Sequence, residues 1–545
     1  MADKYLRPKR DLVKVTVPLS PTNRAYTMES ALSVPEILDE ILRVATPSAQ
    51  AAVAQTCQYW SDCSLRWLWR RMDSFYLLLK LLSPLECVNK TWEFTSDLSA
   101  SDWDRFNRYA ARIFSLKISS RRPYQGQHDS VVSPQIFEEI NLRCPTPDSI
   151  FPNLTEIKWW ADATTDLSPI LLFLVPTVQS LKLTCGGAVG MECLKVLGVL
   201  GPRKIHLTDF GLKMRTHDQD FLDCLPAILA DQTQLTKVRL PPYSATRAIV
   251  AVLGQLPSLK HYAMNIFPEF LIPRELGMEF DWHDGTFPGL DKLAVCITLA
   301  NTSSLMAKSC QPRLRHFELV NRKPFSYTEL ATFCSILSVS QPCLTLIDLD
   351  LYSDTAIGSM GSLSFESFRP LLQCTALVKL CVGSPLAMTY GDEDITTMAS
   401  SWPDLQDLRL CSSPAMDIRL SVGQPLRSVG TFTRSFNRLT HLNIYINSLD
   451  VGLTSDAQSD VHHHRLTEIS FGTSPGPPGS TEAASRYLAD LIEIGGVIKG
   501  RRSLDHILFL GSNPGNTKER SRRAAFWYAI SANVKIIHAG ANHLT

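Results

Sequence analysis

FPNLTEIKWW at residues 151–160 and QPCLTLIDLD at residues 341–350 carry the pattern that decides the fold of this chain. Each has a Pro just before the first of three apolar positions spaced as apolar-x-x-apolar-x-apolar. Apolar and polar residues that alternate over so short a span predict a strand with one buried face. The same spacing recurs at residues 113–118, 154–159, 178–183, 235–240, 259–264, 290–295, 314–319, 344–349, 377–382, 405–410, 439–444, 466–471 and 504–509, with a shortened copy at Ile205 and Leu207.

The stretches between these copies are amphipathic and predict helices, for example at 217–231, 245–255, 327–339 and 482–498. From residue 154 onward the copies follow one another at about 29 residues, a period typical of repeat proteins. Repeated strand–turn–helix units predict an α/β fold in which parallel strands form one sheet and helices cover one of its faces. At about 4.8 Å per strand, the other face is expected to be on the order of 60 Å long.

These copies resemble the leucine-rich repeats of ribonuclease inhibitors, which form a horseshoe-shaped solenoid. The family's Asn or Cys after the strand fits only at Asn447, whereas other copies have residues such as Asp162, Gly186 and Tyr243 there. The resemblance therefore implies a solenoid of degenerate repeats over residues 111–545.

Residues 31–75 have the pattern of three short helices. Ser33 is a candidate helix cap, Glu36 can complete a capping box, and Pro35 suits the first turn because its missing N–H costs nothing there. A second helix is expected to start at Pro47 and to carry Val53, Cys57 and Trp60 on one stripe. A third is expected to place Leu65, Leu68, Trp69 and Met72 together.

This segment resembles the F-box family through Val34-Pro35-Glu36-Ile37-Leu38, Cys57-Gln58-Tyr59-Trp60 and Leu68-Trp69-Arg70. It departs from the family in Val34, where Leu is usual, and in the short loop at Thr46-Pro47. The resemblance implies docking on a Skp-family adaptor that leads to a cullin scaffold. The residues expected to bind the adaptor are Pro35, Ile37, Leu38, Ile41, Leu42, Trp60, Leu68 and Trp69. The alternative is that the module only caps the first repeat, whose apolar face is otherwise open.

Polar residues between the apolar positions of the strands are expected to face solvent, because side chains alternate along a strand. The candidate target-binding residues are Lys158, Trp160, Lys182, Lys204, His206, Lys237, Arg239, Lys292, Asp348, Asp350, Arg409 and Tyr445. Their first half is basic, which favours acidic or phosphorylated target segments. The alternative is that these charges only solvate an open sheet.

Other chemistry has little support in the sequence. The formal net charge of +1 gives no overall attraction to nucleic acid or to a membrane surface. Three adjacent imidazoles at His462-His463-His464 cannot converge on one metal ion, and Gly186 to Gly190 lack the spacing of a nucleotide-binding loop. We expect no catalytic residue, no cofactor and no metal.

The Ser-Pro-containing loop at 472–480 predicts an exposed insertion, and the basic run at 518–523 is either a nuclear signal or a solvated helix face. The N-terminus lacks the apolar core of a secretory signal, and no apolar stretch reaches the length of a membrane span. Fourteen cysteines without a CxxC pair suit reduced thiols in the cytosol or nucleus.

The expected domains are a mobile arm at 1–30, the F-box-like module at 31–75, a helical connector and cap at 76–110, and the solenoid at 111–545. The expected function, implied by the two resemblances, is that of the substrate-recognition subunit of an SCF-type ubiquitin ligase. The alternative is an interaction scaffold with no role in ubiquitination. An enzyme with a site on the sheet has no motif in its favour.

Overall fold

The computed structural model divides the chain into two compact units, unit 1 (Met1–Leu235) and unit 2 (Thr236–Thr545), which are described separately. The residues that it describes are 34–89, 91–119, 131–144, 150–161, 167–187, 190–214, 217–264, 287–309, 313–351, 362–411, 414, 424–448, 466–472, 474, 481–499, 526 and 529–537. The expected mobile arm, the three histidines, the basic run and the last strand motif at 504–509 lie outside these residues.

The described part of unit 1 begins with three helices, α2 (Pro35–Val44), α3 (Pro47–Val53) and α4 (Gln58–Arg70). Helix α4 leads directly into β1 (Arg71–Met72), which pairs in parallel with β4 (Ser115–Ser119). Between these two strands lie α5 (Tyr76–Leu82), the antiparallel pair β2 (Leu85–Val88) and β3 (Thr91–Phe94), and α6 (Ala100–Ala110).

The main sheet of unit 1 has the order β1-β4-β6-β7-β8. Its last three strands are β6 (Glu156–Ala161), β7 (Ser180–Cys185) and β8 (Asp209–Met214), and all neighbouring strands of this order pair in parallel. The remaining elements of unit 1 are β5 (Val131–Val132), α7 (Pro134–Arg143), η3 (Ser168–Leu172), α8 (Gly190–Gly198) and α9 (Gln219–Ala230).

Unit 2 continues the same scheme with parallel strands. In sheet order they are β9 (Lys237–Leu240), β10 (His261–Met264), β11 (Lys292–Val295), β12 (His316–Asn321), β13 (Leu346–Leu351), β15 (Lys379–Gly383), β17 (Asp407–Leu410), β19 (His441–Ile444), β21 (Leu466–Ser470) and β22 (Ile492–Lys499). The helices of its described part include η4 (Pro242–Ser244), α10 (Arg247–Gln255), α11 (Leu299–Ser309), α12 (Tyr327–Ser340), η6 (Phe365–Gln373), α13 (Asp392–Ser401), α14 (Ser428–Ser435) and α15 (Thr481–Leu491). Two small ladders, β14 (Leu363–Ser364) with β16 (Met388–Thr389) and β18 (Gln424–Pro425) with β20 (Ile446–Ser448), complete it.

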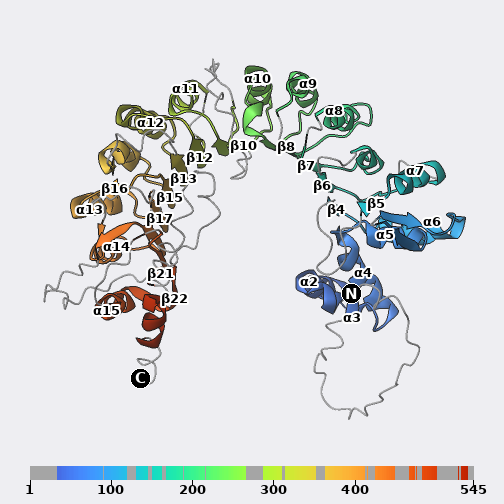
Figure 1. Cartoon of the computed structure of the whole chain (residues 1–545), viewed down its shortest axis with the longest axis horizontal. Helices are drawn as coiled ribbons and strands as arrows, with labels where there is room; N and C mark the ends of the chain where they lie inside the picture. Colours follow the sequence, from blue (N-terminus) through green and yellow to red (C-terminus); the bar gives the residue numbers. More distant parts are fainter. Residues whose placement is uncertain are drawn as a thin grey trace, which may run out of the picture. The chain divides into compact units, whose positions relative to one another are not determined.

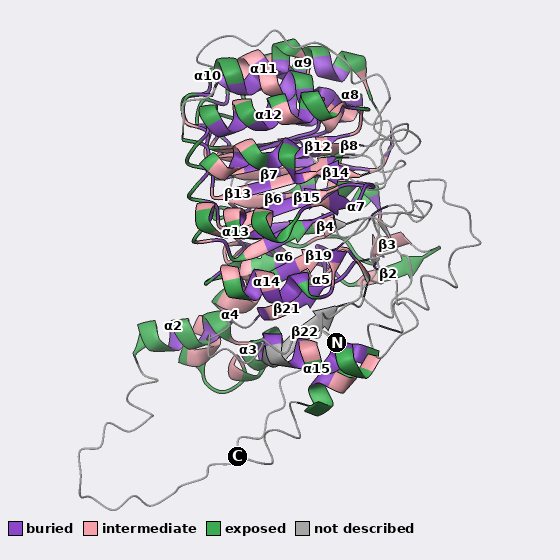
Figure 2. Ribbon diagram, turned by 90° about the vertical axis from the view of Figure 1, so that its left-hand side faces the viewer, coloured by how far each residue is buried: buried purple, intermediate pink, exposed green. Residues whose placement is uncertain are grey.

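The core of each unit lies between its sheet and its helices. Burial alternates along the strands, as in β7, where Leu181 and Leu183 are buried while Lys182 and Thr184 are partly exposed. Figure 1 shows the helices of each unit on one side of the strands, and in Figure 2 buried residues run through the stacked strands and the helices beside them. We call the other side of the strands the open face, because no described helix covers it in either unit.

The repeated unit of parallel strand and helix confirms the α/β repeat solenoid expected from the sequence. The helices expected at 217–231, 245–255 and 327–339 are α9, α10 and α12. The predicted helix at 482–498 is too long and is corrected here, because α15 ends at Leu491 and β22 (Ile492–Lys499) follows it. The run Ile492-Glu-Ile-Gly-Gly-Val-Ile is rich in β-branched residues and Gly, which favour strand over helix.

Two further expectations are corrected by the structure. Helix α2 begins at Pro35 with Val34 as its N-cap, whereas the sequence placed the cap at Ser33, which lies outside the described residues. The predicted second helix, with Val53, Cys57 and Trp60 on one stripe, is also wrong. Helix α3 ends at Val53, and Cys57 is the N-cap of α4. Trp60, Leu68 and Trp69 therefore share one helix, and Met72 lies on β1.

Candidate functional site

Helix α2 exposes a strip of apolar side chains to solvent. Val34, Ile37, Ile41 and Val44 are 38%, 43%, 45% and 71% exposed. The spacing of three, four and three residues places them along one face of the helix. We call these four residues the α2 strip.

Leu38 and Leu42 are buried on another face of α2, at 3% and 1% exposure. Helices α2 and α4 pack against each other, and Trp67 on α4 donates its indole N–H to Asp39 Oδ1 at 2.7 Å. The Gln50 side chain from α3 donates to the carbonyl of Leu42 at 2.7 Å. The expectation that Leu38 and Leu42 face an adaptor is therefore corrected, because both side chains are buried inside the module.

The C-terminal end of α4 packs on the first repeat. Trp69 lies against Tyr109 of α6 with ring centroids 4.6 Å apart, and the Arg70 guanidinium lies 4.4 Å from the Phe114 ring centroid. Arg112 forms an ion pair with Asp62 at 3.2 Å. Trp69 therefore takes part in a contact between the module and the first repeat, and as a half-buried residue its predicted role in adaptor binding stays a prediction. Trp60 and Leu68 are half-buried and Pro35 is exposed, so their role in docking stays a prediction.

On the open face of unit 1, the predicted lysines are neutralised by carboxylates that the sequence reasoning left out. Lys158 and Lys182 reach Glu156 at 2.9 and 3.2 Å, and Lys182 also reaches Asp209 at 3.0 Å. Burial raises the pKa of Glu156, but hydrogen bonds from Lys158, Ser115 and Lys182 outweigh it and lower that pKa to about 2. Glu156 and Asp209 occupy polar strand positions, so reading every such position would have found them.

Lys204 and His206 do not lie on a strand, which corrects their place in the predicted surface. They precede β8, and Lys204 has a left-handed backbone with φ of 55°. The true repeat register there is Leu207-x-x-Phe210-x-Leu212, with all three side chains buried. The shortened motif at Ile205 and Leu207 was therefore five residues too early, because the strand positions that it was meant to mark are Phe210 and Leu212.

The open face of unit 2 carries both charges. Lys237 and Arg239 lie on β9 and Lys292 on β11, where Lys292 contacts Glu318 of β12. Asp350 pairs with Arg322 at 3.2 Å, and Arg409 pairs with Asp407 at 2.9 Å. Tyr445 directly follows β19.

Asp348 differs from its neighbours, since we find no ion pair for it in the described part of unit 2. It lies in register between Glu318 and Cys381. Burial raises its pKa, and so do the nearby charges of Glu318 and Asp350, while the charges of Lys379 and Arg409 oppose this rise. These groups do not converge on a metal: among the described residues, no set of three His, Cys, Asp or Glu side chains is placed to hold one.

Two buried glutamines, one in each unit, bond to backbone groups of a neighbouring repeat. Gln232, just after α9, accepts from Leu207 N at 2.9 Å and donates to the carbonyl of Ile205 at 3.2 Å. Gln341, just after α12, accepts from Leu314 N at 3.3 Å. Both therefore satisfy backbone groups of the segment before a strand. A polar residue at the C-terminal end of a repeat helix was the available sequence signal.

Among the described residues, no helix is long and apolar enough to cross a membrane. No protein-family model matches the chain, and no curated protein matches it either. Among solved structures, it is similar to a chain of the Toll–Spatzle complex from Drosophila, with 13% identity and a TM-score of 0.32 over 75% of this chain. The match covers 46% of that chain, so this protein spans less than half of its length.

It is also similar to a chain in the yeast Rad7–Elc1 complex, with 13% identity and a TM-score of 0.35. That match covers 80% of this chain and 93% of the other. At these values neither likeness assigns a family or a function.

Proposed function

We propose that this chain is the target-recognition subunit of an SCF-type cullin–RING ubiquitin ligase. In this proposal the α2 strip docks on a Skp-family adaptor, and the open face of the repeats holds a target protein. The observation that carries the proposal is the exposed α2 strip. The choice of adaptor comes from the resemblance of residues 31–75 to the F-box family.

The composition of α2 suits a helix that enters a groove on a partner. Apolar side chains form the strip, while the Glu40–Arg43 ion pair, at 2.6 Å, lies exposed on the same helix. An apolar centre with a polar rim is the usual anatomy of a protein interface, and helix-in-groove binding uses anchors at this spacing. The buried contacts of Leu38 and Leu42 hold the helix in place before binding, which reduces the ordering cost.

The proposed contribution to ubiquitination is proximity. A bound target is kept near the ubiquitin-conjugating enzyme, so its lysines have a high effective concentration there. The chain needs no catalytic residue for this role, and its proposed place of action is the cytosol or nucleus.

The contacts of α4 favour a second candidate function. Because Trp69 and Arg70 pack on the first repeat, the module also has the features of an N-terminal cap. A capped interaction scaffold without a ligase role uses these contacts and leaves the α2 strip without a partner. The two candidates therefore differ in whether the strip binds an adaptor.

The test is co-purification of the full chain with a Skp-family adaptor. The variant Ile37→Asp/Ile41→Asp changes only exposed positions, whereas substituting Leu38 or Leu42 would damage the module core. The matched control Met191→Asp/Val339→Asp alters exposed apolar residues on α8 and α12, which are 57% and 71% exposed. We expect the wild type and the control to retain the adaptor and the α2 variant to lose it, with unchanged circular dichroism. Absence of adaptor from the wild type refutes the ligase proposal and leaves the scaffold.

A further inference from the structure

Two buried cysteines of unit 1 meet between β7 and α8. Cys185 is the last residue of β7 and Cys193 lies in the first turn of α8, and their side chains are 2% and 0% exposed. Their Sγ atoms lie 3.5 Å apart. The S–S bond of a disulfide is about 2.05 Å long, so an approach of about 1.5 Å would close it. The two side chains are therefore placed as a dithiol.

Packing holds the backbone on both sides of this pair. Cys185 lies in register with Ala161 of β6 and Met214 of β8, and the next residue, Gly186, donates its N–H to the carbonyl of Ala161 at 2.9 Å. Helix α8 packs against α9 and η3. The contact between the sulfurs is therefore set by the sheet on one side and by the helix layer on the other.

The first turn of α8 also fits closely against the N-terminus of α9. Asp218 caps α9 by accepting from the backbone N–H of Phe221 at 3.0 Å. A Cβ atom at Gly190 would clash with the carboxylate of Asp218, so only glycine allows the two helices to approach in this way. This contact positions the turn on which Cys193 lies.

The surroundings of Cys193 favour its protonated form. The hydrogen bond with Cys185 and burial raise the pKa of Cys193, and the charges of Cys185, Asp218 and Glu192 raise it further. Cys193 therefore keeps its proton at neutral pH and can donate its S–H to the sulfur of Cys185. Peroxides react with thiolates and not with thiols. The sulfur that reacts first is accordingly that of Cys185.

We propose that hydrogen peroxide converts Cys185 and Cys193 into a reversible disulfide. In the first step the Cys185 sulfur attacks one peroxide oxygen, so that an S–O bond forms, the O–O bond breaks and one water leaves. In the second step the Cys193 sulfur attacks the sulfenic acid, so that the S–S bond forms, the S–O bond breaks and a second water leaves. The two thiols lose two electrons to one peroxide molecule, and a dithiol reductant returns them by thiol–disulfide exchange.

The disulfide would act as a lock on one repeat. Because both sulfurs are buried, peroxide reaches them only when the first turn of α8 opens locally. The closed bond ties that turn to the end of β7 and prevents the opening. Oxidation should therefore slow amide hydrogen exchange in α8. This device involves neither the α2 strip nor the open face, so it is independent of the proposed function.

The test exposes the reduced full chain to hydrogen peroxide, blocks the remaining thiols with N-ethylmaleimide and maps the peptides without reduction. We expect the main disulfide to join Cys185 to Cys193, with the linked peptides lighter by two hydrogen atoms. Dithiothreitol should restore both thiols. Hydrogen exchange followed by mass spectrometry should show slower exchange in α8 of the oxidised chain and no change in α12.

A second buried pair in the same sample is the matched control. Cys334 lies on α12 and Cys374 directly after η6, and burial raises the pKa of both thiols. We find no hydrogen bond between these two sulfurs in the described part of unit 2. Equal burial without the close contact should leave them unlinked.

Single variants test the order of the two steps. Cys193→Ser should stop at the sulfenic acid of Cys185, which dimedone traps, whereas Cys185→Ser should give little dimedone adduct at Cys193. Cys334→Ser should form the Cys185–Cys193 disulfide as the wild type does. The wild-type map needs no substitution, so it decides the main question even where a variant fails to fold.

Three results would overturn the proposal. The first is no Cys185–Cys193 link at a peroxide dose that oxidises the exposed Cys57, which would leave the pair as a hydrogen bond inside the core. The second is equal linking of Cys334 to Cys374, which would mark unselective oxidation. The third is unchanged hydrogen exchange in α8 of the linked chain, which would show that the bond locks nothing.

Discussion

At the scale of single residues, the Glu156 side chain on β6 contacts side chains of both neighbouring strands, β4 and β7. Its carboxylate accepts from Ser115 Oγ of β4 at 2.7 Å and lies 2.9 Å from Lys158 and 3.2 Å from Lys182. Its pKa is lowered to about 2 in the folded chain, below the usual value of 4.5. The charged form therefore stabilises the fold at neutral pH.

Replacing Glu156 with Gln should lower the stability of the sheet at pH 7 by about 1 kcal/mol, because three charge-assisted contacts are weakened. The sign of the pH dependence follows from the lowered pKa. The stabilisation is fully present above about 4.5 and is lost as the pH falls toward about 2, so the two proteins should converge there. Thermal unfolding of both across this range is the measurement.

Glu482→Gln is the matched control, because Glu482 forms an exposed ion pair with Arg486 in which both side chains are 73% exposed. Such a pair contributes little, so this change should be close to neutral. A Glu156→Gln penalty that stays constant down to the lowest pH would contradict the assigned role.

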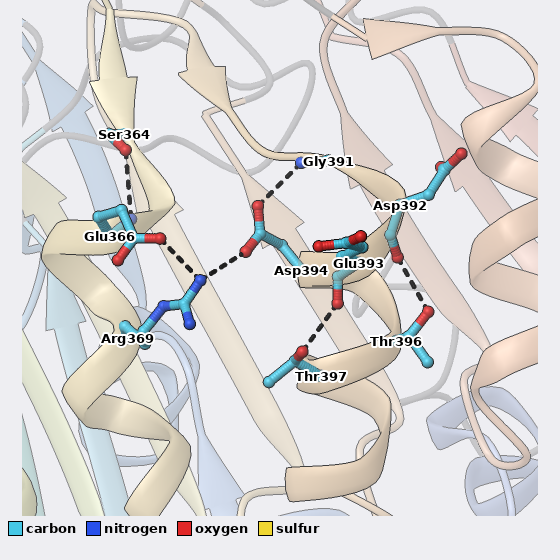
Figure 3. A network of polar contacts seen from close by, with 9 residues as sticks. All are labelled: Ser364, Glu366, Arg369, Gly391, Asp392, Glu393, Asp394, Thr396 and Thr397. Carbon is cyan, nitrogen blue, oxygen red and sulfur yellow. Dashed lines mark hydrogen bonds and ion pairs between the residues drawn. The ribbon is translucent and has the colours of Figure 1, made fainter.

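At the scale of elements, the Asp394 carboxylate caps the N-terminus of α13 and binds an arginine of η6. Asp394 accepts from the backbone N–H of Gly391 at 2.9 Å and from Arg369 at 3.2 Å, as Figure 3 shows. Arg369 also donates to Glu366 at 2.7 Å within η6. Two consecutive repeat helices are thus connected through one arginine.

Asp394→Ala should destabilise unit 2 by about 1 kcal/mol, because the helix loses a backbone cap and favourable negative charge in its first turn. Glu393→Ala is the control, because it removes a carboxylate from the same helical turn without removing a cap. The bond shown for Glu393 is made by its backbone carbonyl, which accepts from Thr397 Oγ1 at 2.8 Å. Chemical unfolding followed by circular dichroism compares the two. Equal losses would show that helix charge, and not the cap, is responsible.

At the scale of the whole molecule, the N-terminal helices have two separable roles, capping the repeat sheet and exposing the α2 strip. Strand β1 pairs with β4 and covers the edge of the repeat sheet, and α4 packs on α6 and Phe114. The α2 strip takes no part in these contacts. An uncovered edge strand is a template for association with other chains.

Removing residues 1–75 should therefore cause self-association and lower the unfolding temperature of the repeats, because β4 and the ring of Tyr109 become exposed. Full-length Ile37→Asp/Ile41→Asp should remain monomeric, since its cap contacts are intact. Size-exclusion chromatography with light scattering measures both. A monomeric truncated chain with unchanged unfolding temperature would show that the module is not a cap.

The repeated strands could be predicted from the sequence because their signal is local. Each strand needs its own buried leucines and its own polar partners between them, so the pattern is written within a few residues. The same logic predicted α9, α10 and α12. The local pattern failed to locate β8 and β22, because strand and helix periodicities overlap there and pairing with the neighbouring strands decides the register.

The sequence by itself determined the α/β repeat architecture and the presence of an apolar helix at residues 35–44. Only the tertiary structure decided which face of that helix is free, because Ile37 and Leu38 are equally apolar and differ only in whether α4 lies beside them. It also decided which strand lysines are neutralised, since Glu156 and Asp209 meet Lys182 only after three strands align. Contacts between residues far apart in the chain leave no local pattern, and packing alone brings them together.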